Sequence, residues 1–370
     1  MNGMSQRGKL HSWCYPVLTF LLALQSLCLA GCASPAWYAQ AVSGHVRLMN
    51  DREDITAILE SGKADMVLAR ELELSIEIRQ FAVSKLFLPD NGSYTQYVRT
   101  GRDAVTWNVI AAPQFSLKPR RWCFIVSGCV PYRGYFEQAE AERLANKLRA
   151  RGYDTAISPA VAYSTLGWFD DPLLDTMFQY SNDQLAAFIF HELAHQKLYV
   201  RGDAAFNEAY ASFVEEEGVR LWLRSRGYLE RLEAWQERQT ASARLNALVS
   251  ATRRKLRQLY SSGLPEERMR TEKFIIIGEM QDAYRALAES EWGGIQYFQS
   301  VLSPDMNNAR LALIYSYQGG ICAFEILYRA SGGRMDRFQE LARDKAAMPA
   351  KERSAWLAQS CAAVASKGNL

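Results

Sequence analysis

The sequence predicts an α+β protein that is predominantly helical, with a small sheet ahead of a central helix and a helical C-terminal region. Apolar residues recur at helical spacing through most of the chain, whereas alternation of apolar residues is confined to short stretches near 105–109 and 122–126. A His-Glu-x-x-His motif at residues 191–195 lies between these stretches and the C-terminal helices. These observations predict a sheet, then a helix that bears the motif, then further helices.

The first residues are typical of a signal peptide and are not expected to belong to the fold. Arg7 and Lys9 precede an apolar stretch, 16–30, that is short for a membrane span and suits a signal-peptide core. The stretch ends in Leu-Ala-Gly-Cys, which resembles the lipobox of bacterial lipoproteins and implies cleavage before Cys32 and lipidation of that residue. Ala33 follows the cysteine where the resemblance would place an Asp for retention in the inner membrane, so the resemblance implies a protein anchored in the outer membrane and facing the periplasm. A plain secretory signal or a short membrane anchor is the alternative.

Composition indicates a folded body with no strong charge field. Hydrophobic residues make up 49% of the chain and aromatic residues 12%, which is enough for a sizeable core. Loss of residues 1–31 removes two basic residues and no acidic residue, so the net charge falls from +3 to +1. The sequence therefore has no excess of basic residues that would indicate nucleic acid as a partner. The sequence does not indicate an oligomeric state.

Four cysteines remain if two leave with the signal peptide and Cys32 is lipidated. An even number of cysteines in an oxidising compartment favours disulfides. Of the three possible pairings we prefer Cys123 with Cys129 and Cys322 with Cys361. Free buried thiols are the alternative.

The remaining elements follow in chain order. Residues 36–88 read as helices, with helix-spaced apolar positions over 51–59 and 65–86. The two alternating stretches predict strands, and they are followed by an amphipathic helix over 138–149 and an extended stretch from 153. After 208 nearly everything reads as helical, including a charged pair over 228–260 and 265–290. We divide the chain into a signal peptide (1–31), an N-terminal part with helices, sheet and motif (32–205), and a helical part (206–370).

The motif at 191–195 predicts a metal site. Ser181 and Gln184 form a capping box, and an apolar run over 185–190 leads from it into the motif, as a buried helix requires. Histidines four residues apart share one helical face, so His191 and His195 can bind one zinc ion while Glu192 lies beside it. Core histidines with structural hydrogen bonds are the alternative, but the chain has only four histidines in all.

A catalytic zinc site needs a third protein ligand and an open position. His11 lies in the signal segment and His45 is remote in sequence, which favours a downstream carboxylate. Glu208 and Glu215 are the candidates, and their separation of two helical turns places them on the same face. The spacing by itself leaves both open.

Two resemblances narrow this choice. The residues over 207–215, read after the His-Glu-x-x-His helix, look like the second zinc helix of gluzincin metallopeptidases, which implies that Glu208 is the ligand and that Glu215 orients a zinc histidine. Only 12 residues separate His195 from Glu208, fewer than in many gluzincins, and spacer length alone would favour Glu215.

A closer resemblance covers most of the mature chain. The blocks at 129–136, 162–172, 206–208 and 307–324, together with the motif helix, are similar to the zinc aminopeptidase family of bacterial lipoproteins, a gluzincin-like group of metallopeptidases. The resemblance implies a zincin-like layout, one Zn²⁺ per chain and a peptide substrate. In that layout a strand upstream of the zinc helix pairs with the substrate, and Ser164, Gly167 and Trp168 are placed to serve.

The expected chemistry is hydrolysis by a metal-activated water, with Glu192 as general base. A tyrosine is expected to stabilise the oxyanion, Tyr317 first and Tyr163 second. Aminopeptidase action also needs an acid that holds the substrate amine, for which Asp170, Asp171 and Glu215 are candidates. The alternatives are a zinc endopeptidase or a cell-wall peptide amidase, and a non-enzymatic zinc-binding quality-control lipoprotein.

Overall fold

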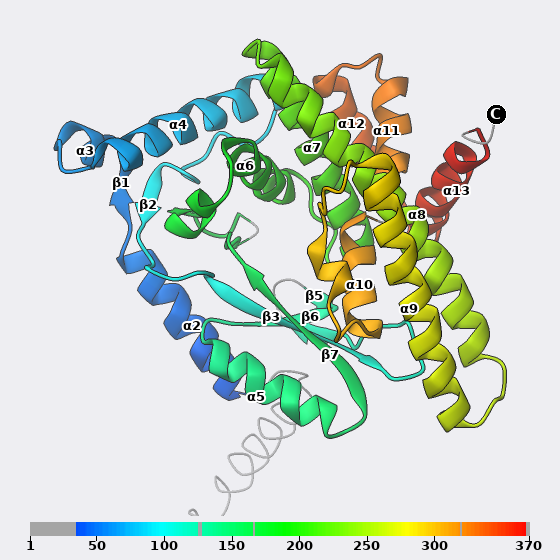
Figure 1. Cartoon of the computed structure of the whole chain (residues 1–370). Helices are drawn as coiled ribbons and strands as arrows, with labels where there is room; N and C mark the ends of the chain where they lie inside the picture. Colours follow the sequence, from blue (N-terminus) through cyan, green and yellow to red (C-terminus); the bar gives the residue numbers. More distant parts are fainter. Residues whose placement is uncertain (1–34, 125–127, 166, 319, 368–370) are drawn as a thin grey trace, which may run out of the picture.

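The computed structural model describes residues 35–124, 128–165, 167–318 and 320–367, with the side chains of 315–318 and 359–367 outside the description. The protein is mostly helical with small sheets, as the sequence predicts (Figure 1). The central sheet has the order β6-β3-β7, and β6 and β7 both run antiparallel to β3. Its strands are β3 (Thr106–Pro113), β6 (Tyr132–Tyr135) and β7 (Tyr153–Ala160).

Two smaller groups of strands accompany the central sheet. One sheet joins β1 (Glu53–Asp54), β2 (Gln96–Val98) and β8 (Leu173–Leu174), and β4 (Trp122–Phe124) pairs with β5 (Gly128–Val130) in a separate hairpin. Cys123 and Cys129 are register partners in that hairpin, with Cα atoms 3.9 Å apart and sulfur atoms within bonding distance. This geometry is compatible with the preferred pairing. The side chain of Cys361 lies outside the described residues, so the second pair stays a prediction.

The alternation of side chains along β3 gives its two faces different roles. Val109 and Ala111 pack with the apolar side of α5 (Gln138–Arg149). On the opposite face, Ile110 packs against α10 (Asn308–Gln318). Thr106 and Asn108 lie on that second face but beyond the helix, where they line a cavity. The register of β3 therefore decides which polar side chains reach the site.

The main core packs α6 (Asn182–Lys197) against α7 (Ala204–Ser225) and α4 (Met66–Leu86). Gly218 of α7 allows this close approach. A Cβ atom there would lie 2.8 Å from carbon atoms of both Leu86 and Phe190, closer than side chains tolerate. The helix that bears the motif is thus held rigidly between two others.

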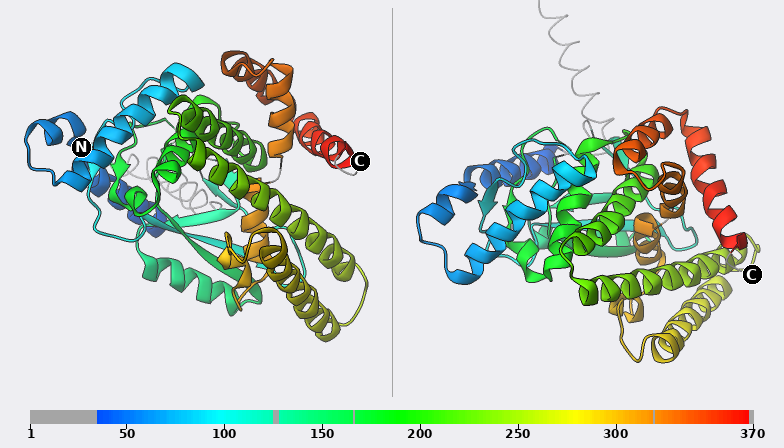
Figure 2. Two further views of the ribbon diagram at one scale, coloured as in Figure 1. Left: turned by 45° about the horizontal axis from the view of Figure 1, so that its top comes forward. Right: turned by 90° about the horizontal axis from the view of Figure 1, so that it is seen from above.

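The remaining helices surround this core. A long antiparallel pair, α8 (Leu229–Tyr260) and α9 (Glu266–Glu291), extends from it with an apolar cluster of its own (Figure 2). The C-terminal helices α11 (Ile321–Ala330) and α13 (Ala350–Lys367) pack against α7, and α12 (Met335–Ala346) contacts α4. The remaining elements are α2 (Pro35–Asn50), α3 (Ile55–Glu60) and the 3₁₀ turns η1 (Asp175–Gln179) and η2 (Gln299–Leu302).

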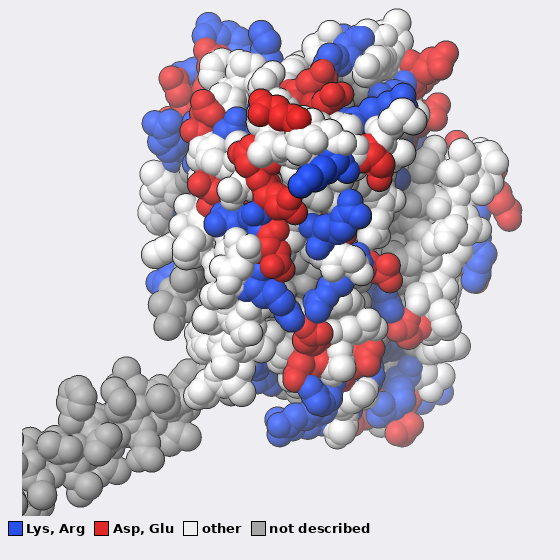
Figure 3. Space-filling view, turned by 90° about the vertical axis from the view of Figure 1, so that its left-hand side faces the viewer, with Lys and Arg blue, Asp and Glu red and all other residues white. Residues whose placement is uncertain are grey.

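Charges of both signs are interspersed over the face that carries α3 and α4 (Figure 3). Among the residues described, no helix combines the length and apolar character that crossing a membrane requires.

Most predicted elements are confirmed, with one correction in the N-terminal helices. The helices predicted over 65–86, 138–149, 228–260 and 265–290 agree with α4, α5, α8 and α9 to within one residue at each end. The predicted helix over 51–59 is wrong in its first half, because Glu53 and Asp54 pair with β2 instead. Asp54 then caps α3 by accepting a hydrogen bond from the backbone N–H of Ala57.

Candidate metal and catalytic site

The motif helix α6 begins as the sequence predicts. The Ser181 side chain accepts a hydrogen bond from the backbone N–H of Gln184. The helix then buries nearly all of its middle part, which places His191 and His195 on one side, a single turn apart. Their Nε2 atoms are 3.2 Å from each other.

A tight connection brings the next helix to these histidines. The Asp203 side chain caps α7 by accepting from the backbone N–H of Phe206. The Asn207 side chain accepts from the Val200 backbone N–H at 2.8 Å and donates to the Val200 carbonyl at 2.9 Å. These bonds tie the start of α7 to the chain that leaves α6. A spacer of 12 residues is therefore enough to deliver Glu208, the next residue, to the histidines.

Glu208 completes a group that could hold a metal ion. Its carboxylate oxygens lie 3.5 Å from Nε2 of His191 and 3.8 Å from Nε2 of His195. All three ligand atoms lie within 4.8 Å of one another. Ligand atoms about 2.05 Å from a tetrahedral ion are about 3.3 Å apart, so the group is near the required size.

Two features of the donor atoms also fit a cation. The facing Nε2 atoms of His191 and His195 cannot bond to each other unless a proton or an ion lies between them. Glu208 Oε2 is buried and has no hydrogen-bond partner. Two imidazole nitrogens and a carboxylate oxygen are the donors that zinc accepts in catalytic sites.

Glu215 contacts the same site from behind. Its Oε2 lies 2.9 Å from Nδ1 of His191, the nitrogen that faces away from the group of ligand atoms. A carboxylate in this position orients the ring and increases its basicity. Burial opposes a charge on His191, but the carboxylates of Glu208 and Glu215 on either side of its ring raise its pKa well above the ordinary value. Burial lowers the pKa of His195 to about 4, which leaves that ring neutral. The site thus favours one positive charge.

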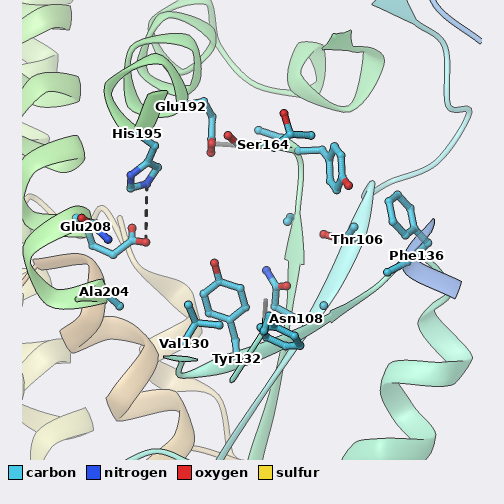
Figure 4. A pocket seen from close by; sticks show the side chains of 18 of the residues that line it. Thr106, Asn108, Val130, Tyr132, Phe136, Ser164, Glu192, His195, Ala204 and Glu208 are labelled. Carbon is cyan, nitrogen blue, oxygen red and sulfur yellow. Dashed lines mark ion pairs between the residues drawn. The ribbon is translucent and has the colours of Figure 1, made fainter. Parts of the chain in front are cut away.

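Glu192 lies beside the ligands in the wall of the same cavity (Figure 4). Burial raises its pKa to about 7, and a hydrogen bond from Ser164 opposes this shift in part. Behind it lies Asp171, which is 1% exposed and accepts hydrogen bonds from Thr165 and Gln196. A carboxyl group with a pKa near neutrality suits a general base.

The cavity has a volume of about 450 Å³ and is built from several parts of the chain. Its floor is the free face of β3 and β6, with Thr106, Asn108 and Tyr132 (Figure 4). α2 contributes Trp37, Tyr38, Gln40 and Ala41 to another wall, and residues 160–165 close the side next to Glu192. Aromatic rings provide much of the lining away from the metal-binding group.

Several tyrosines reach the cavity. The side chain of Tyr317, our first choice for oxyanion stabilisation, lies outside the described residues, so that role stays a prediction. Tyr163, the second choice, lines the cavity, and its hydroxyl lies 3.3 Å from Nδ1 of His45. The sequence analysis missed Tyr132, whose ring projects into the cavity (Figure 4), and Tyr199. Tyr199 follows the end of α6 at Lys197, where helical spacing from His195 no longer applies, so no local pattern pointed to it.

The structure corrects one expectation, which is that residues 164–169 form a strand that pairs with the substrate. The described residues of this segment form a turn and extended chain without strand pairing. Ser164 lines the cavity, where it contacts Glu192 and Asp171. Gly167 adopts φ of 80°, and Trp168 is 70% exposed and is not part of the cavity wall. The expectation came from the layout that the resemblance implied, and the local sequence does not support it, because Trp168 and Phe169 are surface residues.

The three acids proposed to hold a substrate amine are also placed elsewhere. Asp170 is exposed and accepts from the backbone N–H of Gly92. Asp171 is buried behind Glu192, and Glu215 is bound to His191. None of the three lines the cavity.

Comparison with known proteins gives one match. A family model described as "Putative aminopeptidase" matches residues 36–357. No curated protein and no solved structure matches the chain. The matched range includes every residue of the candidate site.

Proposed function

The chain belongs to the Aminopep family, and on that premise we propose that it is a zinc-dependent peptidase. The observation that carries the proposal is the convergence of His191, His195 and Glu208 beside Glu192 in one cavity. Three protein ligands with space for a fourth are typical of catalytic zinc, whereas structural zinc has four protein ligands. The motif helix, followed at once by the helix with the third ligand, also supports a gluzincin-like, zincin-type arrangement.

Zinc bound here would act as a Lewis acid and lower the pKa of a water molecule in its open position. The protein's own groups supply the proton chemistry. Glu192, buried and with a pKa of about 7, can accept the proton of the attacking water and pass it to the leaving amine. Ser164 Oγ lies between Asp171, to which it donates at 3.2 Å, and Glu192, whose carboxylate it helps to position beside the cavity. The hydroxyl of Tyr132, on the cavity floor, is placed to donate to a developing oxyanion.

The experiment combines zinc replacement with one substitution. The purified protein, treated with a chelator, should lose peptide hydrolysis and regain it when zinc is added. Glu192→Gln should still bind one zinc ion but lose about 10²- to 10⁴-fold in kcat, because the general base is gone. Zinc content by elemental analysis and thermal unfolding serve as controls. Full activity in Glu192→Gln, or hydrolysis that survives removal of all metal, would refute the proposal.

We also propose that the protein is a lipoprotein of the bacterial outer membrane, anchored through Cys32. The described chain begins at Pro35, the first residue of α2, and α2 contributes to the cavity wall. An anchor at Cys32 would therefore hold the cavity close to a membrane. Mass spectrometry of the mature N-terminus tests this, with Cys32→Ala as the control that should remain unlipidated. A mature protein that retains residues 1–31 would contradict it.

A further inference from the structure

Among the residues that the structure describes, the wall of the cavity around the proposed metal site carries no charged group besides the catalytic and metal-binding residues. Its two carboxylates are Glu192 and Glu208, which the proposed chemistry uses, and neither lysine nor arginine is among the described residues of its wall. The count of carboxylates is complete, because every Asp and Glu of the chain is among the residues whose side chains are described. The cavity therefore has no acid to spare.

An aminopeptidase needs such an acid close to the metal. The amine and the scissile carbonyl of an N-terminal residue are two bonds apart, about 2.5 Å, so the ammonium must enter the cavity together with the carbonyl. An ammonium removed from water costs several kcal/mol unless it is paired. The metal's own positive charge adds repulsion. In this cavity only Glu192 and Glu208 could pair with a free ammonium group, and the proposed chemistry already uses Glu192 as the general base and Glu208 as a metal ligand.

The lining offers a better match to neutral amide groups. Thr106, Asn108 and Gln40 supply uncharged polar atoms, and Gln40 Nε2 is buried without a hydrogen-bond partner. Such groups bond well to peptide N–H and C=O groups, which carry no charge. Aromatic side chains such as Trp37 and Phe136 line the rest of the wall and suit apolar substrate residues.

From this charge distribution we propose that the site hydrolyses peptide bonds whose amino side is acylated, that is, bonds inside a chain or next to a blocked amine, with uncharged residues around the bond. The inference rests on the proposed function and names its substrate class. The same argument applies to the other end of the peptide, because the described wall has no cation for a terminal carboxylate. The preferred substrate is therefore a peptide whose chain continues on both sides of the bond that is cut.

The test uses matched peptides on the zinc-loaded protein. Each pair has one sequence of apolar and aromatic residues, once with a free amine and once N-acetylated, and cleavage sites are identified by mass spectrometry. We expect acetylation to lower kcat/KM by less than about tenfold and cuts to lie at internal bonds. A loss of about tenfold or more on acetylation, or cuts confined to the first bond of free-amine peptides, would overturn the inference.

Two controls separate this result from failure of the proposed function. Glu192→Gln, which retains the cavity wall, must abolish cleavage of both members of each pair, so that a contaminating peptidase is recognised. If the zinc-loaded protein cleaves no peptide at any bond, the proposed function fails and the inference falls with it. Cleavage restricted to free-amine peptides leaves the metallopeptidase intact and refutes only the substrate class.

Discussion

The roles of the two carboxylates on α7 can be separated by measuring zinc affinity. Glu208 faces both histidine Nε2 atoms, whereas Glu215 bonds to Nδ1 of His191 on the far side of the ring. Removal of a metal ligand should weaken zinc binding much more than removal of a group that only orients a ligand. We therefore predict that Glu208→Gln weakens zinc binding far more than Glu215→Gln does.

The magnitude for Glu215 follows from its position. An imidazole ring lies between its carboxylate and the metal position, so the two charges are roughly 7 Å apart. Coulomb's law gives about 2–5 kcal/mol for a divalent ion at that distance, with an effective dielectric constant of about 20–40. The carboxylate is 28% exposed, and solvent screening reduces this value. The outcome agrees with the loss of about 10- to 100-fold in affinity, about 1.4–2.8 kcal/mol, that is typical when such a partner is removed.

The assay is competition for zinc with a chromogenic chelator, with thermal unfolding of each variant as a check on folding. Glu217→Gln is the matched control, because Glu217 lies two residues from Glu215 but pairs with Arg220. We expect a loss of more than about 1,000-fold for Glu208→Gln, a loss of about 10- to 100-fold for Glu215→Gln, and little change in the control. The reasoning is refuted if Glu215→Gln loses as much affinity as Glu208→Gln, or if Glu208→Gln binds as the parent does.

Two further predictions concern stability, measured by urea unfolding. Gly218→Ala should cost about 1–3 kcal/mol, because the new methyl group has no room between α4 and α6. At Gly278 of α9 a Cβ atom would have no neighbour within 4 Å, so Gly278→Ala should be neutral or stabilising by about 0.5–1 kcal/mol. Equal losses of stability at Gly218 and Gly278 would contradict the packing argument. Lys273→Ala should cost about 3 kcal/mol, because it removes the ion partner of the largely buried Asp154 carboxylate, which keeps the hydrogen bond from the backbone N–H of Asn308. Lys255→Ala, which breaks an exposed pair, should cost at most about 1 kcal/mol, and a larger loss there than at Lys273 would refute the assignment.

The helices were predictable because their signals are local. Ser181 caps α6 with the side-chain hydrogen bond that its sequence context indicated, and Asp65, where the helical periodicity of α4 begins, caps that helix in the same way. The helix predicted over 51–59 failed for the opposite reason. Glu53 pairs with Tyr97, more than 40 residues away, and helical periodicity in the segment contains no information about that partner.

The site was predictable only where one helix carries it. The motif gives the spacing of its two histidines directly, and the family resemblance indicated Glu208. The cavity wall was not predictable. Asn108 and Tyr132 reach it because β3 and β6 pair in a particular register and α10 covers only part of their shared face. A shift of one residue in that register would turn the side chains of the shifted strand to the opposite face of the sheet, so Asn108 and Tyr132 would no longer share one face.

The short spacer, which departs from the resemblance, explains in physical terms why Glu208 rather than Glu215 lies close to both histidine Nε2 atoms. Hydrogen bonds from Asn207 hold the start of α7 against the end of α6, so the two helices run back along each other from that point. Glu208 lies in the second turn of α7 and meets His195, close to the end of α6. Glu215 is seven residues further, about 10 Å along the axis, and so reaches His191 from its outer side. A longer spacer would remove the Asn207 contact and with it the reason for this order.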